Sequence, residues 1–159
     1  MTILKKGVSI DEVIHCFESE NRGSLSFSYT ARLLREAGAN SGDDWCLVRL
    51  SQADILNISL PHHRHPPDVT VIPEPGMEVA AAADCVIEIT RRIGPCWENI
   101  QSHKNRDFSK THLFLKFENG VLSHLDGLHR LLAWAIFDKD QELDAYVSAF
   151  RADSPAENP

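Results

Sequence analysis

The chain has 159 residues, of which 43% are hydrophobic and 25% are charged, a balance typical of one globular domain. Its formal net charge is −7 and no cluster of lysine and arginine stands out, which disfavours nucleic-acid binding. No apolar run approaches the roughly 20 residues of a membrane span, and the first residues are too polar for a signal peptide. We therefore expect a cytoplasmic protein without membrane contact.

The first 40 residues predict two helices. Ser9 to Ser19 has an apolar stripe, and Ser9 with Glu12 three residues later is typical of a capping box at a helix start. A second helix is predicted from Ser28 to Ala37, with Gly38 as the residue that ends it.

The middle of the chain predicts a strand, a loop and a third helix. Trp45 to Leu50 alternates apolar and polar residues as a strand does, and a short helical turn follows it in residues 51–60. Residues 61–76 contain several prolines and predict a long loop. Met77 to Arg92 is amphipathic and rich in alanine, which favours a helix. Residues 95–110 are polar and receive no assignment.

The last third predicts a hairpin, a helix and a strand. Thr111 to Phe117 and Val121 to Leu125 are two strands separated by a short turn that contains an asparagine-glycine pair. Leu128 to Phe137 then forms a helix, and Asp144 to Phe150 forms an edge strand.

These elements together predict an α/β (α+β) fold in which helices surround a small mixed sheet. We expect one domain over residues 1–150, with the N-terminal helices of residues 1–40 as an extension. Residues 151–159 have no apolar periodicity and are expected to form a disordered tail.

The four cysteines show neither a C-x-x-C pair nor a regular spacing, which argues against a zinc motif and against a disulfide framework. Each lies among apolar neighbours, so we interpret them as small core residues. They are Cys16, Cys46, Cys85 and Cys96.

The turn from Asp126 to Arg130 (DGLHR) is the main candidate site. Gly127 allows a sharp turn where the strand ends, and the N–H groups near Gly127 and Leu128 open at the helix start. His129 and Arg130 stand in the first helical turn, so an anion there would meet a positive dipole end and a guanidinium group. The pattern therefore predicts a phosphate-sized anion site.

A purely structural role for the same turn stays open. Asp126 would then cap the helix, Gly127 would serve the turn, and Arg130 would pair with a surface acid. His129 would be a half-buried histidine with its hydrogen bonds satisfied.

The turn DGLHR, preceded by FLKFENGVLSHL and followed by LLAWAIF, resembles the phosphate-binding signature of the ParB/sulfiredoxin-like superfamily. The resemblance covers Thr111 to Phe150 well and Trp45 to Pro67 loosely. Members of that superfamily include DNA-partition CTPases, sulfiredoxin ATP enzymes and free-amino-acid kinases, whose D-G-x-H-R turn holds nucleotide phosphates. The resemblance implies that Asp126, Gly127, His129 and Arg130 line a phosphate site. Sulfiredoxin chemistry would need a reactive cysteine where this chain has Leu128, so we do not expect it.

A proline-rich segment with three histidines in four positions is the second candidate site. His63 and His65 can converge on one ligand, whereas the adjacent His62 and His63 point to opposite sides of an extended chain. An exposed polar loop, an anion or substrate contact and a metal site all stay open. Free-amino-acid kinases place a catalytic glutamate in such a loop, facing the phosphate turn. Here His63, Glu74 or Asp68 would act in its place, or kinase activity is absent.

We hypothesise phosphoryl transfer from ATP or ADP to a small metabolite. Arg130 would neutralise the transferred group, His129 would donate a hydrogen bond to a phosphate oxygen, and His63 would orient the acceptor. Mg²⁺ would bridge the phosphates, and Asp126 is the nearest residue to hold it.

Two other functions stay open at this point. One is a non-catalytic accessory protein that binds a metabolite or nucleotide and acts on a partner enzyme. The other is a lyase or hydrolase led by the histidine loop. In each case the main partner is a small molecule, and a homodimer is compatible with the sequence.

Overall fold

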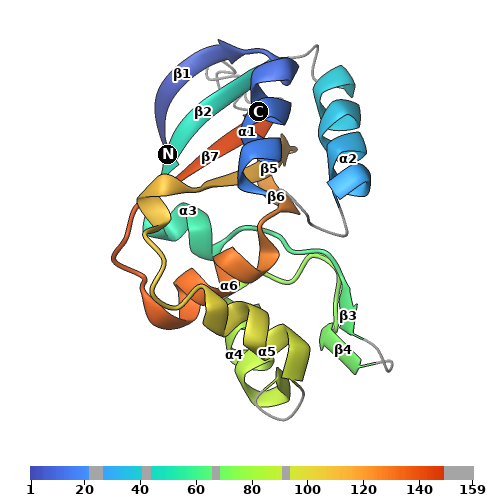
Figure 1. Ribbon diagram of the computed structural model, residues 1–159, viewed down its shortest axis with the longest axis vertical. Coiled ribbons are helices and arrows are strands. Elements are labelled where there is room, and N and C mark those ends of the chain that lie inside the picture. Colours follow the sequence, from blue (N-terminus) through green and yellow to red (C-terminus); the bar gives the residue numbers. More distant parts are fainter. Residues whose placement is uncertain (22–26, 41–43, 66–68, 91–93, 149–159) are drawn as a thin grey trace, which may run out of the picture.

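The computed structural model describes residues 1–21, 27–40, 44–65, 69–90 and 94–148 (Figure 1). The strands in chain order are β1 (Thr2–Val8), β2 (Trp45–Leu50), β3 (His63–His65), β4 (Val69–Ile72), β5 (His112–Glu118), β6 (Val121–Asp126) and β7 (Leu143–Ser148). The helices are α1 (Ile10–Glu20), α2 (Phe27–Asn40), α3 (Gln52–Leu56), α4 (Val79–Thr90), α5 (Gly94–Ser102) and α6 (Leu128–Phe137), with a short 3₁₀ helix, η1 (Phe108–Lys110).

Five strands form a mixed sheet in the order β1-β2-β7-β5-β6. The β5–β7 pair is parallel and the other neighbours are antiparallel, while β3 and β4 pair as a separate hairpin. The predicted α+β class, with a small mixed sheet surrounded by helices, is confirmed. None of the helices in the described segments has the length and apolar character needed to cross a membrane.

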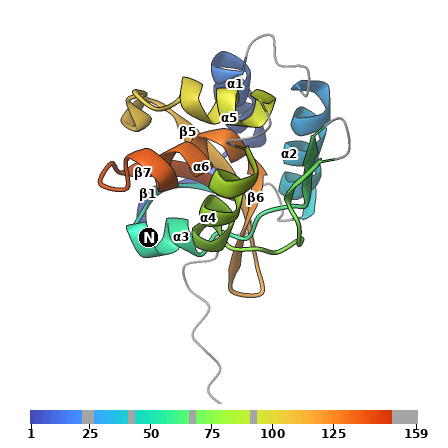
Figure 2. The ribbon, with the colours of Figure 1, turned by 90° about the horizontal axis from the view of Figure 1, so that it is seen from below.

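Helices cover both faces of this sheet. Trp45, Phe114 and Tyr146 lie on the face that packs against α1 and α2. Alternate residues such as Val48 and Val147 lie on the other face, whose core includes residues of α3, α4, α5 and α6. In Figure 1 α4, α5 and α6 lie below the sheet, and Figure 2 shows them from below. Burial on both faces explains why β2 and β7 are rich in apolar residues.

The two N-terminal helices form as predicted, with corrections at their ends. Ser9 caps α1 by accepting a hydrogen bond from the Glu12 N–H, but the Glu12 carboxylate binds Lys5 and does not complete a capping box. Gly38 lies inside α2, so its prediction as the terminating residue was wrong. β1 was not predicted, because its consecutive lysines obscure the strand pattern; its pairing with β2 contains register shifts.

The middle of the chain contains a hairpin and two short helices that were not predicted. Residues 61–76, expected to be a loop, contain the β3–β4 hairpin, whose paired residues lie between Pro61 and Pro73. The unassigned residues 95–110 contain α5 and η1, and Pro95 stands in the first turn of α5, where a missing N–H costs no helical hydrogen bond.

The last third matches the prediction closely, with one correction. The β5–β6 hairpin turns through Asn119 and Gly120, both with positive φ, and α6 has the predicted bounds. By contrast β7, predicted as an edge strand, is the central strand of the sheet, paired with β2 and β5. The predicted tail, residues 151–159, lies outside the described residues.

A buried ion-pair network joins the helices on the two faces of the sheet. Arg130 of α6, only 5% exposed, donates to Glu20 at the end of α1 over 2.7 Å and to Asp126 over 2.9 Å. The other Glu20 oxygen lies 2.7 Å from His112 Nδ1 on β5. Each of these partly or fully buried charges therefore has a partner of opposite sign.

The network changes the proton affinity of its members. Burial alone would raise the pKa of Glu20, but hydrogen bonds from His112 and the charge of Arg130 lower that pKa below its ordinary value. Contacts with the Cys16 sulfur and the Glu20 carboxylate raise the pKa of His112 to about 10. His112 is therefore protonated at neutral pH and forms a charged link between α1 and the sheet.

Gly127 has a positive φ and is closely packed, so a side chain at this position would be strained in two ways. Its φ is +99°, and a Cβ added there would lie 2.9 Å from Leu113 Cδ2, in the core. At Gly120, with φ +81°, an added Cβ would meet nothing within 4 Å. In urea denaturation, Gly120→Ala should cost about 1 kcal/mol of unfolding free energy because of its backbone. Gly127→Ala should lose the same amount and a further ~1–3 kcal/mol, because the added methyl group overpacks the core. Equal losses of unfolding free energy in the two variants would contradict the close packing of Gly127.

The His112 link predicts a pH-dependent stability. The pKa of His112 is raised in the folded state above the ordinary 6.5, so its contribution is complete below about pH 6.5 and lost as pH rises through about 10. We expect the difference in unfolding free energy between the wild type and His112→Gln to shrink steadily over that range. The measurement is urea denaturation at a series of pH values. A difference that grows with pH would show that His112 is neutral in the folded protein.

Candidate functional site

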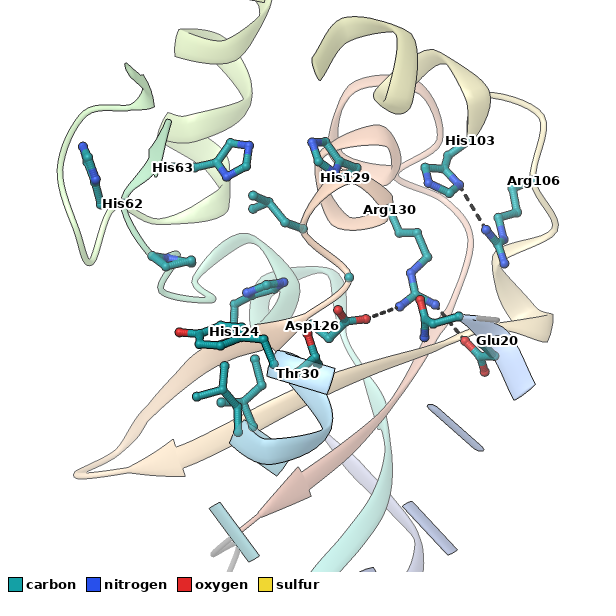
Figure 3. A pocket seen from close by; sticks show the side chains of 17 residues that line it. Glu20, Thr30, His62, His63, His103, Arg106, His124, Asp126, His129 and Arg130 are labelled. Carbon is teal, nitrogen blue, oxygen red and sulfur yellow. Dashed lines mark hydrogen bonds and ion pairs between the residues drawn. The ribbon is translucent and has the colours of Figure 1, made fainter. Parts of the chain in front are cut away.

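A cavity of about 700 Å³ opens at the N-terminus of α6 (Figure 3). Its wall contains residues from the end of α1, from α2, from the segment that leads into β3, and from the segment between α5 and η1. The floor is formed by the end of β6 and the turn into α6. Segments that are far apart in the sequence therefore meet at this cavity.

The cavity brings together most of the residues that the sequence analysis singled out. All five residues of the DGLHR turn line it, and so do His62 and His63. The exposed Glu74 does not line it. Asp68 and the side chain of His65 lie outside the described residues.

The start of α6 presents its backbone to the cavity. Gly127 is the N-cap residue in a left-handed conformation, and as a glycine it has no side chain to cap the helix. Asp126, to which the structural alternative gave the capping role, accepts a hydrogen bond from the N–H of Gly127 itself. The first intrahelical bond runs from the Leu131 N–H to the Gly127 carbonyl, so the preceding N–H groups belong to the open end of the helix.

Arg130 and Asp126 are already engaged with each other. The structural alternative, in which Arg130 pairs with a surface acid, was wrong because both of its carboxylate partners are partly or largely buried. Burial raises the pKa of Asp126 above its ordinary value although Arg130 opposes this change. The Asp126 carboxylate accepts hydrogen bonds from Arg130 and from the Gly127 N–H. A carboxylate held against a cation in this way does not fit the role of a direct Mg²⁺ ligand.

Arg106 supplies a second guanidinium group to the cavity wall. Its Nη1 lies 3.1 Å from His103 Nδ1. Burial, helped by the charges of Arg106 and Arg130, lowers the pKa of His103 to about 4, so a neutral imidazole accepts the hydrogen bond. Among the described residues, no carboxylate lies within salt-bridge distance of Arg106.

Sequence reasoning missed Arg106. Its chain neighbour Asp107 pairs with Lys110 over 2.8 Å. Arg106 itself lines the cavity. Arg106 belongs to residues 95–110, which received no assignment, and their polar sequence carried no pattern that could have shown its place in the cavity wall.

Cys96 of α5 lies between two of the cavity histidines. Its Sγ is 3.1 Å from His129 Nε2 and 3.8 Å from His63 Nε2. The two imidazole rings meet edge to face, with centroids 5.4 Å apart. Burial raises the pKa of Cys96 to about 11. The sequence placed Cys96 in the core, and its burial confirms this, but nothing in the spacing indicated its histidine neighbours.

His124 lies deeper in the cavity wall and has a different role. Its Nε2 atom is buried and has no hydrogen-bond partner among the described residues. Burial lowers the pKa of His124 to about 3, and the charges of Arg130, His129 and His63 add to this effect. The ring is therefore neutral at physiological pH and presents no charge to the cavity.

A second cluster, of Cys16, Glu20 and His112, resembles a catalytic triad in composition but not in geometry. The Cys16 sulfur and a Glu20 oxygen both lie near His112 Nδ1, at 3.4 and 2.7 Å. In a nucleophilic triad the two partners use different ring nitrogens, because one orients the base and the other gives up its proton. The cluster therefore serves the ion-pair network of the fold.

Comparison with known proteins gives a family without a known function. No curated protein and no solved structure matches the chain. The resemblance to the ParB/sulfiredoxin-like superfamily thus stays a prediction. One family model, described as a family of unknown function (DUF6309), matches residues 1–159. The chain belongs to this DUF6309 family.

Proposed function

We propose that the cavity binds the phosphate of a nucleotide and that the protein transfers a phosphoryl group from ATP or ADP to a small metabolite. One observation carries this proposal. The N-terminus of α6 and the side chain of Arg106 line the same cavity. The volume of about 700 Å³ also lies in the range of small-molecule sites.

The helix start provides the first half of the phosphate site. The unpaired N–H groups and the aligned peptide dipoles make the N-terminus of a helix equivalent to about +0.5 of a charge. α6 has ten residues, so its dipole is well developed, and Gly127 lets the backbone approach an anion without a side chain in the way. A phosphate would bind at the N–H groups of the first helical turn.

Arg106 provides the second half, a role that the sequence analysis gave to Arg130. The charge of Arg130 is balanced by Glu20 and Asp126, whereas Arg106 is held by the neutral His103. In our proposal Arg106 therefore neutralises the phosphoryl group, and Arg130 positions the DGLHR turn.

The acceptor substrate is assigned to the side of the cavity that contains His63. Figure 3 shows His63 and Arg106 on opposite sides of the α6 N-terminus, so a phosphate between them could be approached from the His63 side. The Nε2 atom of His129 points to Cys96, so the proposal assigns phosphate binding to the backbone and not to this ring. No step depends on Asp126 as a magnesium ligand.

One observation favours a second candidate, hydrolysis of a phosphate ester. Two histidines and a cysteine converge at the cavity wall, and such groups commonly serve hydrolysis as metal ligands or as acids and bases. This function would use the same anion site but would need no acceptor other than water.

The anion site is tested by thermal unfolding of the wild type, Arg106→Gln and Lys104→Gln with ATP, ADP, phosphate and pyrophosphate, each with magnesium. A ligand at 100 times its Kd stabilises the folded state by about 2.7 kcal/mol. We expect this stabilisation to be lost in Arg106→Gln and kept in Lys104→Gln, because Lys104 lies over the Phe137 ring and does not line the cavity. If both variants lose the stabilisation equally, the effect of charge is non-specific. If Arg106→Gln is stabilised as much as the wild type, the role of Arg106 is refuted.

Turnover assays then distinguish the functions. Nucleotide consumption that requires an added metabolite supports phosphoryl transfer. Phosphate release without an acceptor supports hydrolysis. Stabilisation with neither kind of turnover would leave the non-catalytic binding function.

The positioning role of Arg130 predicts a loss of stability. Arg130→Gln leaves Glu20 and Asp126 without their common cation, and breaking a buried pair in this way typically costs ~3–5 kcal/mol. We expect a loss of this size in urea denaturation. Glu20→Gln combined with Arg130→Gln should cost less than the sum of the single changes, because the two side chains are in contact. Additive losses would mean that the contact between Glu20 and Arg130 contributes nothing to the stability of the fold.

A further inference from the structure

Three side chains with atoms that bind transition metals meet at the wall of the cavity. His63 comes from β3, Cys96 from α5 and His129 from the first turn of α6. One ligand atom from each, two imidazole nitrogens and one sulfur, lie within 4.8 Å of one another. The three residues lie far apart in the sequence, so the fold alone brings them together.

The distances agree with those around a tetrahedral zinc ion. Zinc bonds to sulfur of ~2.3 Å and to nitrogen of ~2.0–2.1 Å place neighbouring sulfur and nitrogen ligands about 3.6 Å apart. The observed distances from Cys96 Sγ to the Nε2 atoms of His129 and His63 are 3.1 and 3.8 Å, one on each side of that value. Small side-chain rotations are therefore enough to admit an ion.

We infer that His63, Cys96 and His129 form a three-ligand Zn²⁺ site at the wall of the cavity. Two imidazoles and a thiolate form a borderline-soft set, which favours zinc over Mg²⁺ and Ca²⁺ because those ions prefer oxygen. Three protein ligands leave one position of a tetrahedron open, as in catalytic zinc sites.

The open position faces the cavity. His63 and His129 line the cavity wall, whereas Cys96 is 2% exposed and lies behind them. An ion between the three would thus have protein on the cysteine side and the cavity on the other. Water or an oxygen of a bound anion would complete its coordination, so the metal and the α6 N-terminus would act on the same ligand.

The metal site does not depend on the proposed function, because it requires no phosphate. Both inferences hold together if the open position binds a phosphate oxygen. The test therefore uses metal alone, without nucleotide, so that failure of the metal site and failure of the anion site can be told apart.

The experiment titrates Co²⁺ into protein that has been freed of metal with a chelator and shown to be folded by circular dichroism. Cobalt replaces zinc in such sites and gives a charge-transfer absorption when a thiolate is bound. We expect one Co²⁺ per chain with this absorption, and displacement of the cobalt by one equivalent of Zn²⁺. Cys96→Ser should abolish the charge-transfer band. His63→Ala should weaken binding by more than the roughly 10- to 100-fold loss that follows removal of an outer-shell partner.

Two matched variants serve as controls. His62→Ala removes the neighbouring histidine that lines the cavity outside the cluster, and Cys16→Ser removes the cysteine of the Cys16, Glu20 and His112 cluster. Both should bind Co²⁺ as the wild type does. The inference is overturned if the folded wild type binds no Co²⁺ at micromolar metal, if the band survives in Cys96→Ser, or if Cys16→Ser abolishes it. If Cys96→Ser does not fold, wild-type affinity in His63→Ala overturns the inference instead, because His63 is on the small outer hairpin.

Discussion

The candidate site depends on the ion pairs that the buried guanidinium group of Arg130 forms with Glu20 and Asp126. A charge that is 95% removed from solvent must have partners, and Arg130 has Glu20 from the opposite helical layer and Asp126 from the end of β6. These bonds hold the end of α1 against the turn into α6 and so help to define the cavity wall. They also balance the charge of Arg130, and our proposal therefore assigns anion binding to Arg106.

The cavity consequently has two chemically different ends. At one end Arg106, held by the neutral His103, faces the open N-terminus of α6 and suits an anion. At the other end His63 and His129 meet Cys96, and these ligands suit a soft cation. A phosphorylated ligand that is bound by its oxygens at the first end and approached by a metal at the second would use both. The two ends share α6, whose first turn supplies backbone to one and His129 to the other.

Local patterns predicted the last third of the chain well and its surroundings less well. The bounds of α6 and the β5–β6 hairpin follow from helical periodicity and from an asparagine-glycine turn, both of which are properties of short segments. β7 was placed at an edge, because an apolar run of six residues does not reveal how many neighbours it has. β1 was not predicted because its own residues form only a weak strand pattern. Its pairing with β2, which the sequence does not reveal, holds it in the sheet.

The sequence by itself determined that a strand, a sharp glycine turn and a helix would follow one another around residues 126–130, because each of these features is local. The resemblance to the ParB/sulfiredoxin-like superfamily implied that the histidine segment would face that turn, and His63 lines the same cavity as the turn. Which arginine keeps its charge available, and which cysteine lies between the histidines, was decided only by the tertiary structure. The ion pairs and the contacts of Cys96 join segments that are far apart in the sequence, such as those of Glu20 and Arg130, and no pattern along the chain encodes them.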